Sequence, residues 1–391
     1  MIVHAYYPIG ETRVEREARA LVDRGYEVDV ICLQGRNDSK VEAQDGITIY
    51  RLPVRRDRTS GAALQLGEYL TFFAWAFAQV TVLHRRRHYR VVQAHNLPDF
   101  LVFAALVPKL TGARLILDLH DLMPEFYAAR FNRDMTSWPV RLVRWQEQLA
   151  CCFADHVITV TKLWCETLIQ RGVPPDKVSV VMNVADSRIF CRMPPPLAPT
   201  PDEHFHLIYH GNITDRYGMD LAIRAVDLVR AQIPQIHLTI HGKGSHLETL
   251  QKLVKELRLE DQVEFSLRAL HTCELPELIR QAHVGLVPYR SNVFTDGILP
   301  TKLMEYVALG VPVIAARTPA IAAYFDDTMV EFFEPGNVDD LKRCILTLYS
   351  DRTRRAQLVQ NADKFNQDYS WSSISAEYAQ LVERLAQHEP S

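Results

Sequence analysis

The amino-acid sequence predicts an α/β protein with two tandem domains, each built on a parallel sheet with helices on both faces. Two observations predict this class. Short apolar runs alternate with amphipathic helical patterns along the whole chain, which is the order typical of doubly wound sheets. A proline-rich stretch, Met193 to Pro201, divides the alternation into two series, because proline fixes φ and removes a backbone donor.

Length and composition agree with this class. The chain has 391 residues, more than one hydrophobic core ordinarily serves. A net charge of -3 predicts no nucleic-acid partner. The seven cysteines lack the C-x-x-C spacing of zinc sites, and we expect them to be small buried residues in a reducing compartment. The start of the chain lacks the basic-then-apolar order of a signal peptide, so we expect a cytoplasmic location.

The first series predicts a Rossmann-like domain over residues 1–191. A strand at 2–7 is followed by a helix over 15–24 and a second strand at 28–33, which is the opening of a doubly wound sheet. The same order continues with strands at 91–95, 114–118, 155–160 and 178–181 and a helix over 100–110.

The second series predicts another Rossmann-like domain over 205–368, joined to the first by a stiff linker at 192–204. Its expected strands lie at 205–210, 236–240, 263–265, 284–287 and 311–315, and its expected helices include 220–230 and 301–309. A last amphipathic helix over 371–385 lies in the C-terminal segment 369–391. Because ligands bind beyond the carboxyl ends of such strands, we expect the two domains to face each other across a cleft.

One apolar run, Tyr69 to Leu83, is followed directly by arginines. It is shorter than the roughly 20 residues that a spanning helix needs, so it predicts a buried or interfacial helix. The apolar-then-basic order favours peripheral contact with an anionic membrane. A solvated basic face is the alternative. The arginines are Arg85, Arg86, Arg87 and Arg90.

The stretch from Leu299 to Tyr306 is the most informative for chemistry. A helix that begins near Thr301 exposes backbone N–H groups that suit a phosphate. Lys302 in that first turn opposes the helix dipole, and a bound diphosphate would reconcile the two; an ordinary exposed lysine is the alternative. Glu305 shares the helix face with Lys302. Its carboxylate suits the hydroxyls of a ribose, and a surface glutamate is the alternative.

Two glycine-containing loops of the second half also suit a phosphate. Gly211 follows the strand at 205–210, and Arg216 in the same loop offers a fork of donors that matches phosphate oxygens. The second loop, after the strand at 236–240, carries Lys243 between two glycines. Either loop alone is weak evidence, but both follow strands of one sheet.

In the first half, polar residues follow two of the expected strands, where sites of α/β proteins collect. His120 and Asp121 follow the strand at 114–118 and could orient a hydroxyl or accept a proton. A hydrogen-bonded loop residue is the alternative for each. His95 ends the strand before it.

An ordered set of motifs across nearly the whole chain resembles family 4 of the glycosyltransferases, which are retaining enzymes of the two-Rossmann GT-B fold. The motifs are Arg13-Val14 with Glu17-Ala18, His120-Asp121 with Pro124-Glu125, the run 154–160, Val181-Met182-Asn183 with Phe190, Gly242-Lys243-Gly244, and the run 299–306.

The resemblance implies that the C-terminal domain holds a nucleotide sugar, the N-terminal domain holds the acceptor, and the last helix crosses back onto the N-terminal domain. It implies no metal or other cofactor, because cationic side chains and helix N-termini offset the leaving diphosphate. Arg216 and Lys302, with Gly211 and Thr301, are the expected diphosphate contacts. Glu305 corresponds to the second glutamate of the family's Glu-x7-Glu pattern and His120 to its histidine near the donor sugar.

The sequence departs from the family's pattern at three places. The slot of the first glutamate falls on Gly297, and the neighbouring Asp296 is the candidate replacement. Arg216 is displaced from the usual position of the arginine in the phosphate loop. The family's glycine pair after the first strand is replaced by residues 8–13, where Gly10 and Arg13 remain candidates for the cleft.

The sequence thus predicts a metal-independent glycosyltransferase that moves a hexosyl unit from a UDP- or GDP-sugar, with retention, to a saccharide or lipid-linked saccharide. Similar chains often build bacterial surface polysaccharides. A sugar-nucleotide epimerase and an inactive partner subunit of a polysaccharide assembly are the alternatives. A dinucleotide oxidoreductase is disfavoured, since no G-x-G-x-x-G follows a strand.

Overall fold

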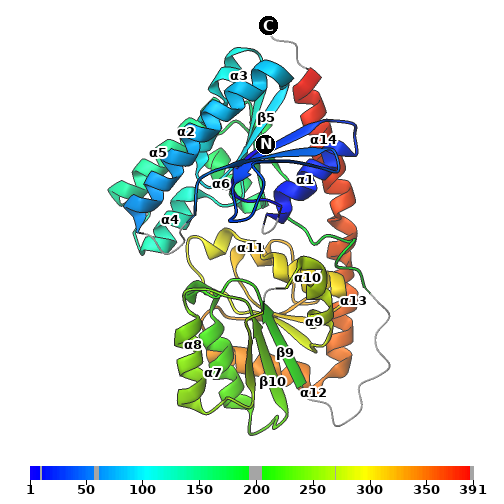
Figure 1. Cartoon of the computed structure of the whole chain (residues 1–391). Coiled ribbons are helices and arrows are strands. Elements are labelled where there is room, and N and C mark those ends of the chain that lie inside the picture. Colours follow the sequence, from blue (N-terminus) through cyan, green and yellow to red (C-terminus); the bar gives the residue numbers. More distant parts are fainter. Residues whose placement is uncertain (9–10, 57–60, 193–204, 269, 388–391) are drawn as a thin grey trace. The chain divides into compact units, whose positions relative to one another are not determined.

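The structure, a computed structural model, describes residues 1–8, 11–56, 61–192, 205–268 and 270–387. Gly10 and residues 193–204 of the expected linker lie outside this part of the chain. The chain forms two compact units (Figure 1). Unit 1 comprises residues 1–183 and 372–391, and unit 2 comprises residues 184–371.

Unit 1 is built on an eight-stranded sheet in the order β3-β4-β2-β1-β5-β6-β7-β8. Its strands pair in parallel except β3, which runs antiparallel to β4. Every residue of β2 is buried, as expected where helices cover both faces of a parallel sheet. The strands are β1 (Ile2–Tyr6), β2 (Val28–Leu33), β3 (Val41–Gln44), β4 (Ile47–Leu52), β5 (Val91–His95), β6 (Arg114–Leu119), β7 (His156–Thr159) and β8 (Val178–Val180).

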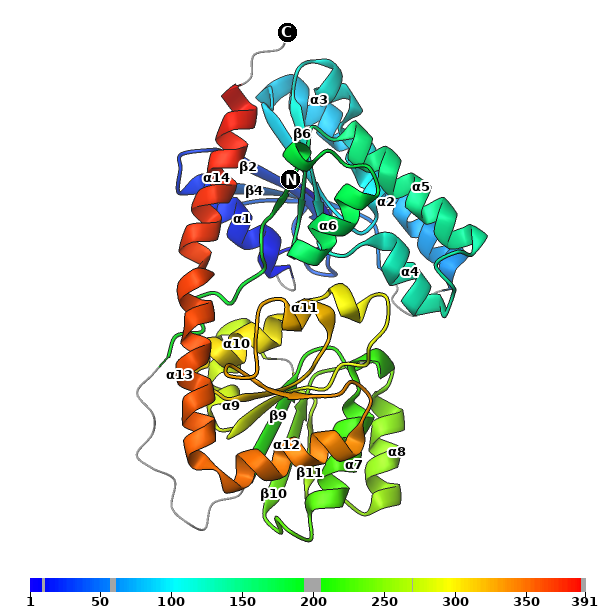
Figure 2. The same ribbon diagram turned by 180° about the vertical axis from the view of Figure 1, so that it is seen from behind.

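The α-helices of unit 1 are α1 (Thr12–Val22), α2 (Ala62–Arg87), α3 (Leu106–Leu110), α4 (Met123–Phe131), α5 (Trp138–Phe153), α6 (Lys162–Gln170) and α14 (Trp371–Gln387). Figures 1 and 2 show α14, in red, beside α1. The last helix therefore crosses back to the N-terminal domain, and the GT-B arrangement of two parallel α/β sheets with a returning C-terminal helix is confirmed.

Unit 2 holds a six-stranded, fully parallel sheet in the order β11-β10-β9-β12-β13-β14. The strands are β9 (Phe205–His210), β10 (Ile236–His241), β11 (Val263–Ser266), β12 (Val284–Val287), β13 (Val313–Ala316) and β14 (Glu331–Phe333). The helices are α7 (Met219–Val229), α8 (Leu247–Leu257), α9 (Leu275–Arg280), α10 (Thr301–Leu309), α11 (Pro319–Ala322), α12 (Val338–Ser350) and α13 (Arg352–Asp368).

Three local expectations differ from the structure. Helix α2 runs from Ala62 to Arg87, well beyond the apolar run at 69–83, because its flanking residues are also good helix formers. The helix expected over 100–110 is a 3-10 helix, η1 (Asp99–Ala105), followed by the short α3. Not all the cysteines are buried: Cys152, Cys191 and Cys273 are exposed, and all seven are free.

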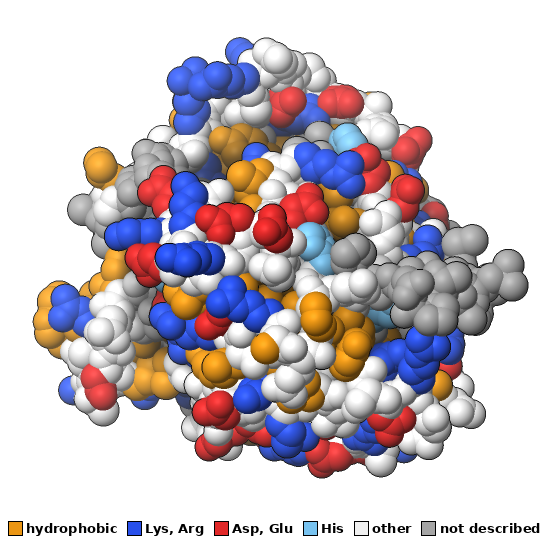
Figure 3. Space-filling view, turned by 90° about the horizontal axis from the view of Figure 1, so that it is seen from below, with side chains coloured by type: hydrophobic (Ala, Val, Ile, Leu, Met, Phe, Trp, Pro, Cys, Tyr) orange, Lys and Arg blue, Asp and Glu red, His pale blue; other side chains and the backbone are white. Residues whose placement is uncertain are grey.

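Charge is mixed over the surface. On the face shown in Figure 3, Lys and Arg side chains are interspersed with Asp and Glu. This agrees with the near-balance of charges in the sequence, where 44 basic residues stand against 47 acidic ones.

Candidate functional site

The sheet of unit 2 has a switch point at β9. The chain goes from β9 outward to β10 and β11, and then returns to β12 on the other side of β9. The loops that follow β9 and β12 therefore leave the sheet in opposite directions, and the space between them is where ligands of open α/β sheets bind. The loop after β9 includes the 3-10 helix η3 (Asp215–Tyr217).

Lys302, in the first turn of α10, lies at this switch point inside a cage of tyrosines. Its ammonium donates a hydrogen bond of 2.9 Å to the hydroxyl of Tyr289. The same Nζ lies 4.7, 5.1 and 5.0 Å from the ring centroids of Tyr209, Tyr217 and Tyr289. The residue is only 7% exposed, so the interpretation as an ordinary exposed lysine is wrong. Burial lowers its pKa to about 8.

Three glycines let backbone segments close tightly around this lysine. A Cβ on Gly211 would meet Lys302 Cε at 3.3 Å. A Cβ on Gly242 would lie 1.9 Å from the carbonyl oxygen of Gly211, and one on Gly218 would lie 1.9 Å from that of Pro288. A larger residue would not fit between the loops after β9, β10 and β12, so close packing of these loops requires glycine at the three positions.

Glu305, one turn further along α10, lies beside the end of β9. Its Oε2 is 3.1 Å from His210 Nε2, and its side chain is 15% exposed. An ordinary surface glutamate is therefore excluded. The carboxylate also acts on Lys302, whose pKa it raises against the larger effect of burial. Helix α10 thus presents a buried cation and a partly buried carboxylate at the same switch point.

The remaining expected residues of unit 2 are less enclosed. Arg216 is half-buried, with its guanidinium 5.1 Å from the ring centroid of Phe294. Asp296 is half-buried and accepts hydrogen bonds of 2.9 and 3.0 Å from the hydroxyl of Ser291. Burial raises its pKa. Thr301 and Lys243 are exposed.

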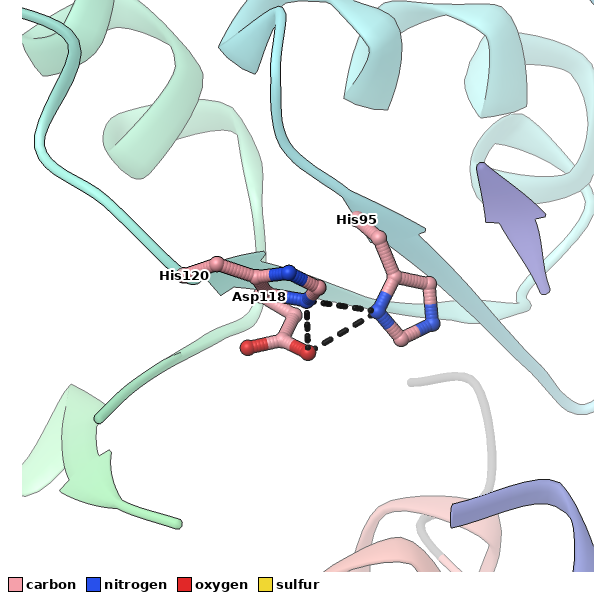
Figure 4. Close-up of side chains that lie close together, drawn as sticks. All are labelled: His95, Asp118 and His120. Carbon is pink, nitrogen blue, oxygen red and sulfur yellow. Dashed lines mark hydrogen bonds and ion pairs between the residues drawn. The ribbon is translucent and has the colours of Figure 1, made fainter. Parts of the chain in front are cut away.

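A second cluster lies in unit 1, again at a switch point, because β1 stands between β2 and β5. Figure 4 shows its centre, where His95 and His120 converge on Asp118. Asp118 Oδ2 is 2.9 Å from His95 Nδ1 and 3.0 Å from His120 Nε2. The backbone N–H of His120 donates to Asn96 Oδ1 at 2.8 Å, which fixes the loop after β6.

Arg13 completes this cluster from α1. Its Nε and Nη2 donate to the two oxygens of Asp118, each at 2.9 Å, and its Nη1 donates to the carbonyl of Val181 at 2.7 Å. Glu17, one turn on, lies 3.1 Å from Arg13 Nε and accepts from Gln93 at 2.7 Å. Arg13 therefore fixes the carboxylate of Asp118, a role that the resemblance to the family did not assign to it.

The charges in this cluster depend on one another. Burial raises the pKa of the Asp118 carboxyl, but the charges of Arg13 and His120 lower it by more. Together they hold this pKa well below the usual range. Burial lowers the pKa of His95 to about 4. Burial also opposes the charged form of His120, yet the neighbouring Asp118 raises the pKa of that histidine. His120, with a side chain 21% exposed, is thus the member that can present a proton to a ligand.

His95, Asp118 and His120 have ligand atoms close enough together for a metal ion. The geometry disfavours one, because Arg13 already donates to both oxygens of Asp118 and a cation there would face the guanidinium. Asp121, the other expected residue of this loop, is half-buried. Sequence reasoning missed the roles of Asp118 and of the tyrosine cage; their position at or just beyond strand ends was the available signal.

Comparisons with known proteins identify the class. Residues 10–183 match the family described as Glycosyl transferase 4-like domain, and residues 198–365 match Glycosyl transferases group 1. Among solved structures, the chain resembles sucrose-phosphate synthase from Thermosynechococcus elongatus, with a TM-score of 0.77, 20% identity, and 98% and 95% of the two chains covered. It also resembles Anabaena Alr3699/HepE in complex with UDP-glucose, with a TM-score of 0.72, 17% identity, and 98% of each chain covered.

Curated relatives agree. The putative colanic acid biosynthesis glycosyltransferase WcaL of Escherichia coli is 24% identical over 96% of this chain and 97% of that protein. The match to WcaL of Salmonella typhimurium is 25% identical and spans 59% of this chain but only 57% of that protein. Fold and site thus define a GT-B enzyme that transfers a sugar from a nucleotide sugar. The chain belongs to family 4 of the glycosyltransferases.

Proposed function

We propose that the protein transfers a hexosyl unit, with retention of configuration, from a UDP- or GDP-sugar to a saccharide or lipid-linked saccharide acceptor during polysaccharide synthesis. The observation that carries the proposal is the buried, tyrosine-caged Lys302 beside three close-fitting glycines at the switch point of unit 2. A buried cation needs a counter-charge, and the diphosphate of a nucleotide sugar supplies one.

In this proposal the bond between the anomeric carbon and the diphosphate oxygen breaks while the carbon bonds to the acceptor oxygen. The acceptor hydroxyl loses its proton, so the products are the glycoside, the nucleoside diphosphate and one proton. Negative charge develops on the leaving diphosphate, and Lys302, Arg216 and the first N–H groups of α10 stabilise it without a metal. Thr301 and Gly211 supply further contacts to the same phosphates. The exposed Lys243, in the loop after β10, adds positive charge near these phosphates.

Glu305 accepts hydrogen bonds from the ribose hydroxyls, because its carboxylate lies one turn beyond the phosphate-binding end of α10. The N-terminal domain holds the acceptor. His120 donates a hydrogen bond to the transferred sugar, which its raised pKa favours. Arg13 supports His120 through Asp118, and Asp121 is the next residue of the same loop. Asp296 takes the place of the family's first glutamate near the sugar.

The experiment that tests the proposal is a calorimetric and thermal-shift screen against UDP, GDP, ADP and their common sugars, with EDTA present. We expect one nucleoside diphosphate class to bind. Lys302→Ala and Glu305→Ala should each weaken its binding by about tenfold to a hundredfold, the effect of losing a charge-assisted contact. Lys255→Ala and Glu256→Ala, which change exposed residues on α8, are the matched controls and should leave affinity unchanged.

Turnover distinguishes the alternatives. His120→Ala should keep the affinity for the nucleoside diphosphate, which lacks the sugar, but lower kcat by about a hundredfold. Turnover of the donor sugar without any acceptor would favour the epimerase instead. If the folded protein binds no nucleotide, the inactive partner subunit becomes the better explanation, and the observation behind that alternative is Gly297 in the slot of the first glutamate.

A further inference from the structure

The outward face of helix α2 is apolar, although it is a surface helix. The exposed residues of a surface helix are normally polar, with the apolar ones turned toward the core. On α2 the core-facing residues are apolar as expected, with Phe72, Ala76 and Val80 at most 2% exposed. The exposed part of the helix is apolar as well: its large exposed side chains are Leu64, Leu66, Leu70, Trp75 and Val82, all between 47% and 72% exposed.

A second helix of unit 1 repeats the pattern. Along α5, the residues Trp138, Leu142, Trp145 and Leu149 recur at helical spacing and are 76%, 54%, 57% and 41% exposed. The 3-10 helix η1 links the two helices. The ring centroid of Phe73 on α2 lies 6.0 Å from that of Phe100, and the centroid of Phe153 on α5 lies 4.9 Å from that of Phe103. Figures 1 and 2 agree that α2 and α5 run side by side along one edge of unit 1.

The charges of these helices have one sign. The only acidic residues within 64–90 and 138–153 are Glu68 and Glu147. Both are engaged inside unit 1, Glu68 with His4 at 3.0 Å and Glu147 with Arg171 at 2.8 Å. The exposed charges on the two segments are all arginines, namely Arg85, Arg86, Arg90, Arg141 and Arg87, of which Arg87 pairs with Glu27 at 2.9 Å. This differs from the mixed surface of Figure 3.

We propose that the exposed apolar faces of α2 and α5, defined by the large exposed side chains named above, dock this domain on an anionic phospholipid surface. The apolar side chains enter the boundary between headgroups and acyl chains, where tryptophan is favoured. The arginines at the end of α2 contact the anionic headgroups, each strengthening attachment about fivefold. This docking concerns a surface separate from the donor site.

Docking explains α2 better than spanning does. Residues 64–87 are long and apolar enough to cross a membrane by length and composition, and only 28% of the most apolar stretch is buried. The buried side of α2, however, packs on β1, β2 and β4 as part of the domain. A spanning helix would have to leave that core and expose Phe72 and its neighbours, while an interfacial one keeps it.

The test is co-sedimentation of the full chain with vesicles, without nucleotide. The vesicles are either phosphatidylcholine alone or an equal mixture of phosphatidylglycerol and phosphatidylcholine. We expect binding to the mixed vesicles at low salt, weaker binding at high salt because the arginine contribution is screened, and much weaker binding to phosphatidylcholine. Trp75→Ser with Trp145→Ser should lower the partition coefficient at least about tenfold.

Arg85→Gln with Arg86→Gln should lower partition to the mixed vesicles about fivefold for each arginine and change binding to phosphatidylcholine little. This charge variant keeps the test decisive even if the tryptophan variant fails to fold. The matched controls lie in unit 2: Leu228→Ser, which removes a side chain 41% exposed on α7, and Arg352→Gln, an exposed arginine. Neither should change partition.

Three results would overturn the proposal. The first is full recovery of the wild-type chain in the supernatant of mixed vesicles at low salt. The second is a wild-type dimer in light scattering that Trp75→Ser with Trp145→Ser converts to a monomer without any vesicle binding, which would assign the face to a second copy. The third is membrane association that survives high salt and alkaline washing, which would indicate a spanning helix.

Discussion

Lys302 holds its proton at an energetic cost. Burial among Tyr209, Tyr217 and Tyr289 takes away the water that would solvate an ammonium, and the pKa falls to about 8. The raised pKa values of Tyr209 and Tyr289, also caused by burial, keep those phenols neutral. Glu305 opposes the fall in the pKa of the lysine but does not cancel it. In the proposed complex the diphosphate is a further counter-charge.

Donor affinity should therefore depend on pH in a defined direction. Below about 8 the lysine is protonated and attracts the diphosphate fully. Above that pKa the free enzyme loses the proton, and affinity should fall by up to about tenfold for each pH unit. Calorimetry across this range measures the effect, and Lys302→Met should give a weak but flat profile. A wild-type profile that is equally flat would show that the ammonium does not govern binding.

For single residues, the sequence indicates which positions belong to the candidate site, but it does not indicate which side chains surround them. Lys302 and Glu305 could be chosen because their spacing puts them on one face near a helix start. The cage could not be predicted, since Tyr209, Tyr217 and Tyr289 meet only when β9 and β12 become neighbours. The same holds for Asp118, whose partners Arg13 and His95 come from α1 and β5.

At the scale of elements, the alternation of strands and helices predicts most strands of both sheets. It misses β3, β4 and β14, and it does not reveal local turn chemistry. The β3–β4 hairpin closes with Asp45 and Gly46, both at positive φ. An Asp-Gly pair of this kind is a strong hairpin signal, yet the polar β3 lacks the apolar run that marks the buried strands. The apolar run alone likewise predicts too short an α2, because Gly67 and Glu68 interrupt the apolar pattern on its N-terminal side and arginines follow it on the other.

Close contact between the loops after β9 and β12 gives an element-scale prediction. Gly218 has φ +65°, and a Cβ there would lie 1.9 Å from the carbonyl oxygen of Pro288. Gly218→Ala must push apart the loops that carry the stacked rings of Tyr217 and Tyr289, 4.6 Å apart. We expect a loss of about 1–3 kcal/mol of unfolding free energy and weaker donor binding, measured by denaturant titration and calorimetry.

Gly67→Ala is the matched control for this change. Gly67 is exposed within α2, and a Cβ at this position would meet nothing within 4 Å. Alanine there should stabilise the chain by about 0.5–1 kcal/mol through helix propensity and leave donor affinity unchanged. Wild-type affinity in Gly218→Ala would mean that the tyrosine cage does not depend on this loop contact.

At the scale of the whole molecule, the N-terminal domain is completed by the last helix of the chain. Tyr378 on α14 is fully buried, and its hydroxyl donates at 2.6 Å to Gln93 on β5, 285 residues earlier. Gln93 in turn donates to Glu17, which lies beside Arg13, the partner of Asp118. The returning helix thus joins a chain of buried polar contacts that ends at His120.

Removing the hydrogen bond between Tyr378 and Gln93 should destabilise the N-terminal domain and leave unit 2 unaffected. Tyr378→Ala leaves a cavity and an unpaired Gln93 oxygen, so we expect a loss of about 3–5 kcal/mol from unfolding of that domain. Tyr378→Phe removes only the hydroxyl and should cost about 1–2 kcal/mol. Denaturant unfolding should show the N-terminal transition moving to a lower midpoint, while calorimetry shows unchanged donor affinity below pH 8.

Two outcomes would contradict the prediction that the Tyr378 variants affect the stability of the N-terminal domain and not donor affinity. Equal stability of Tyr378→Ala and the wild type would mean that α14 is dispensable to the N-terminal domain. A loss of donor affinity in step with the loss of stability would show instead that the two domains unfold as one cooperative unit. Tyr378→Phe separates these outcomes, because it keeps the ring packed among its neighbours and removes only the hydrogen bond to Gln93. A donor affinity that stays at the wild-type value in both variants, while the midpoint falls further in Tyr378→Ala, would establish that the returning helix stabilises the N-terminal domain alone.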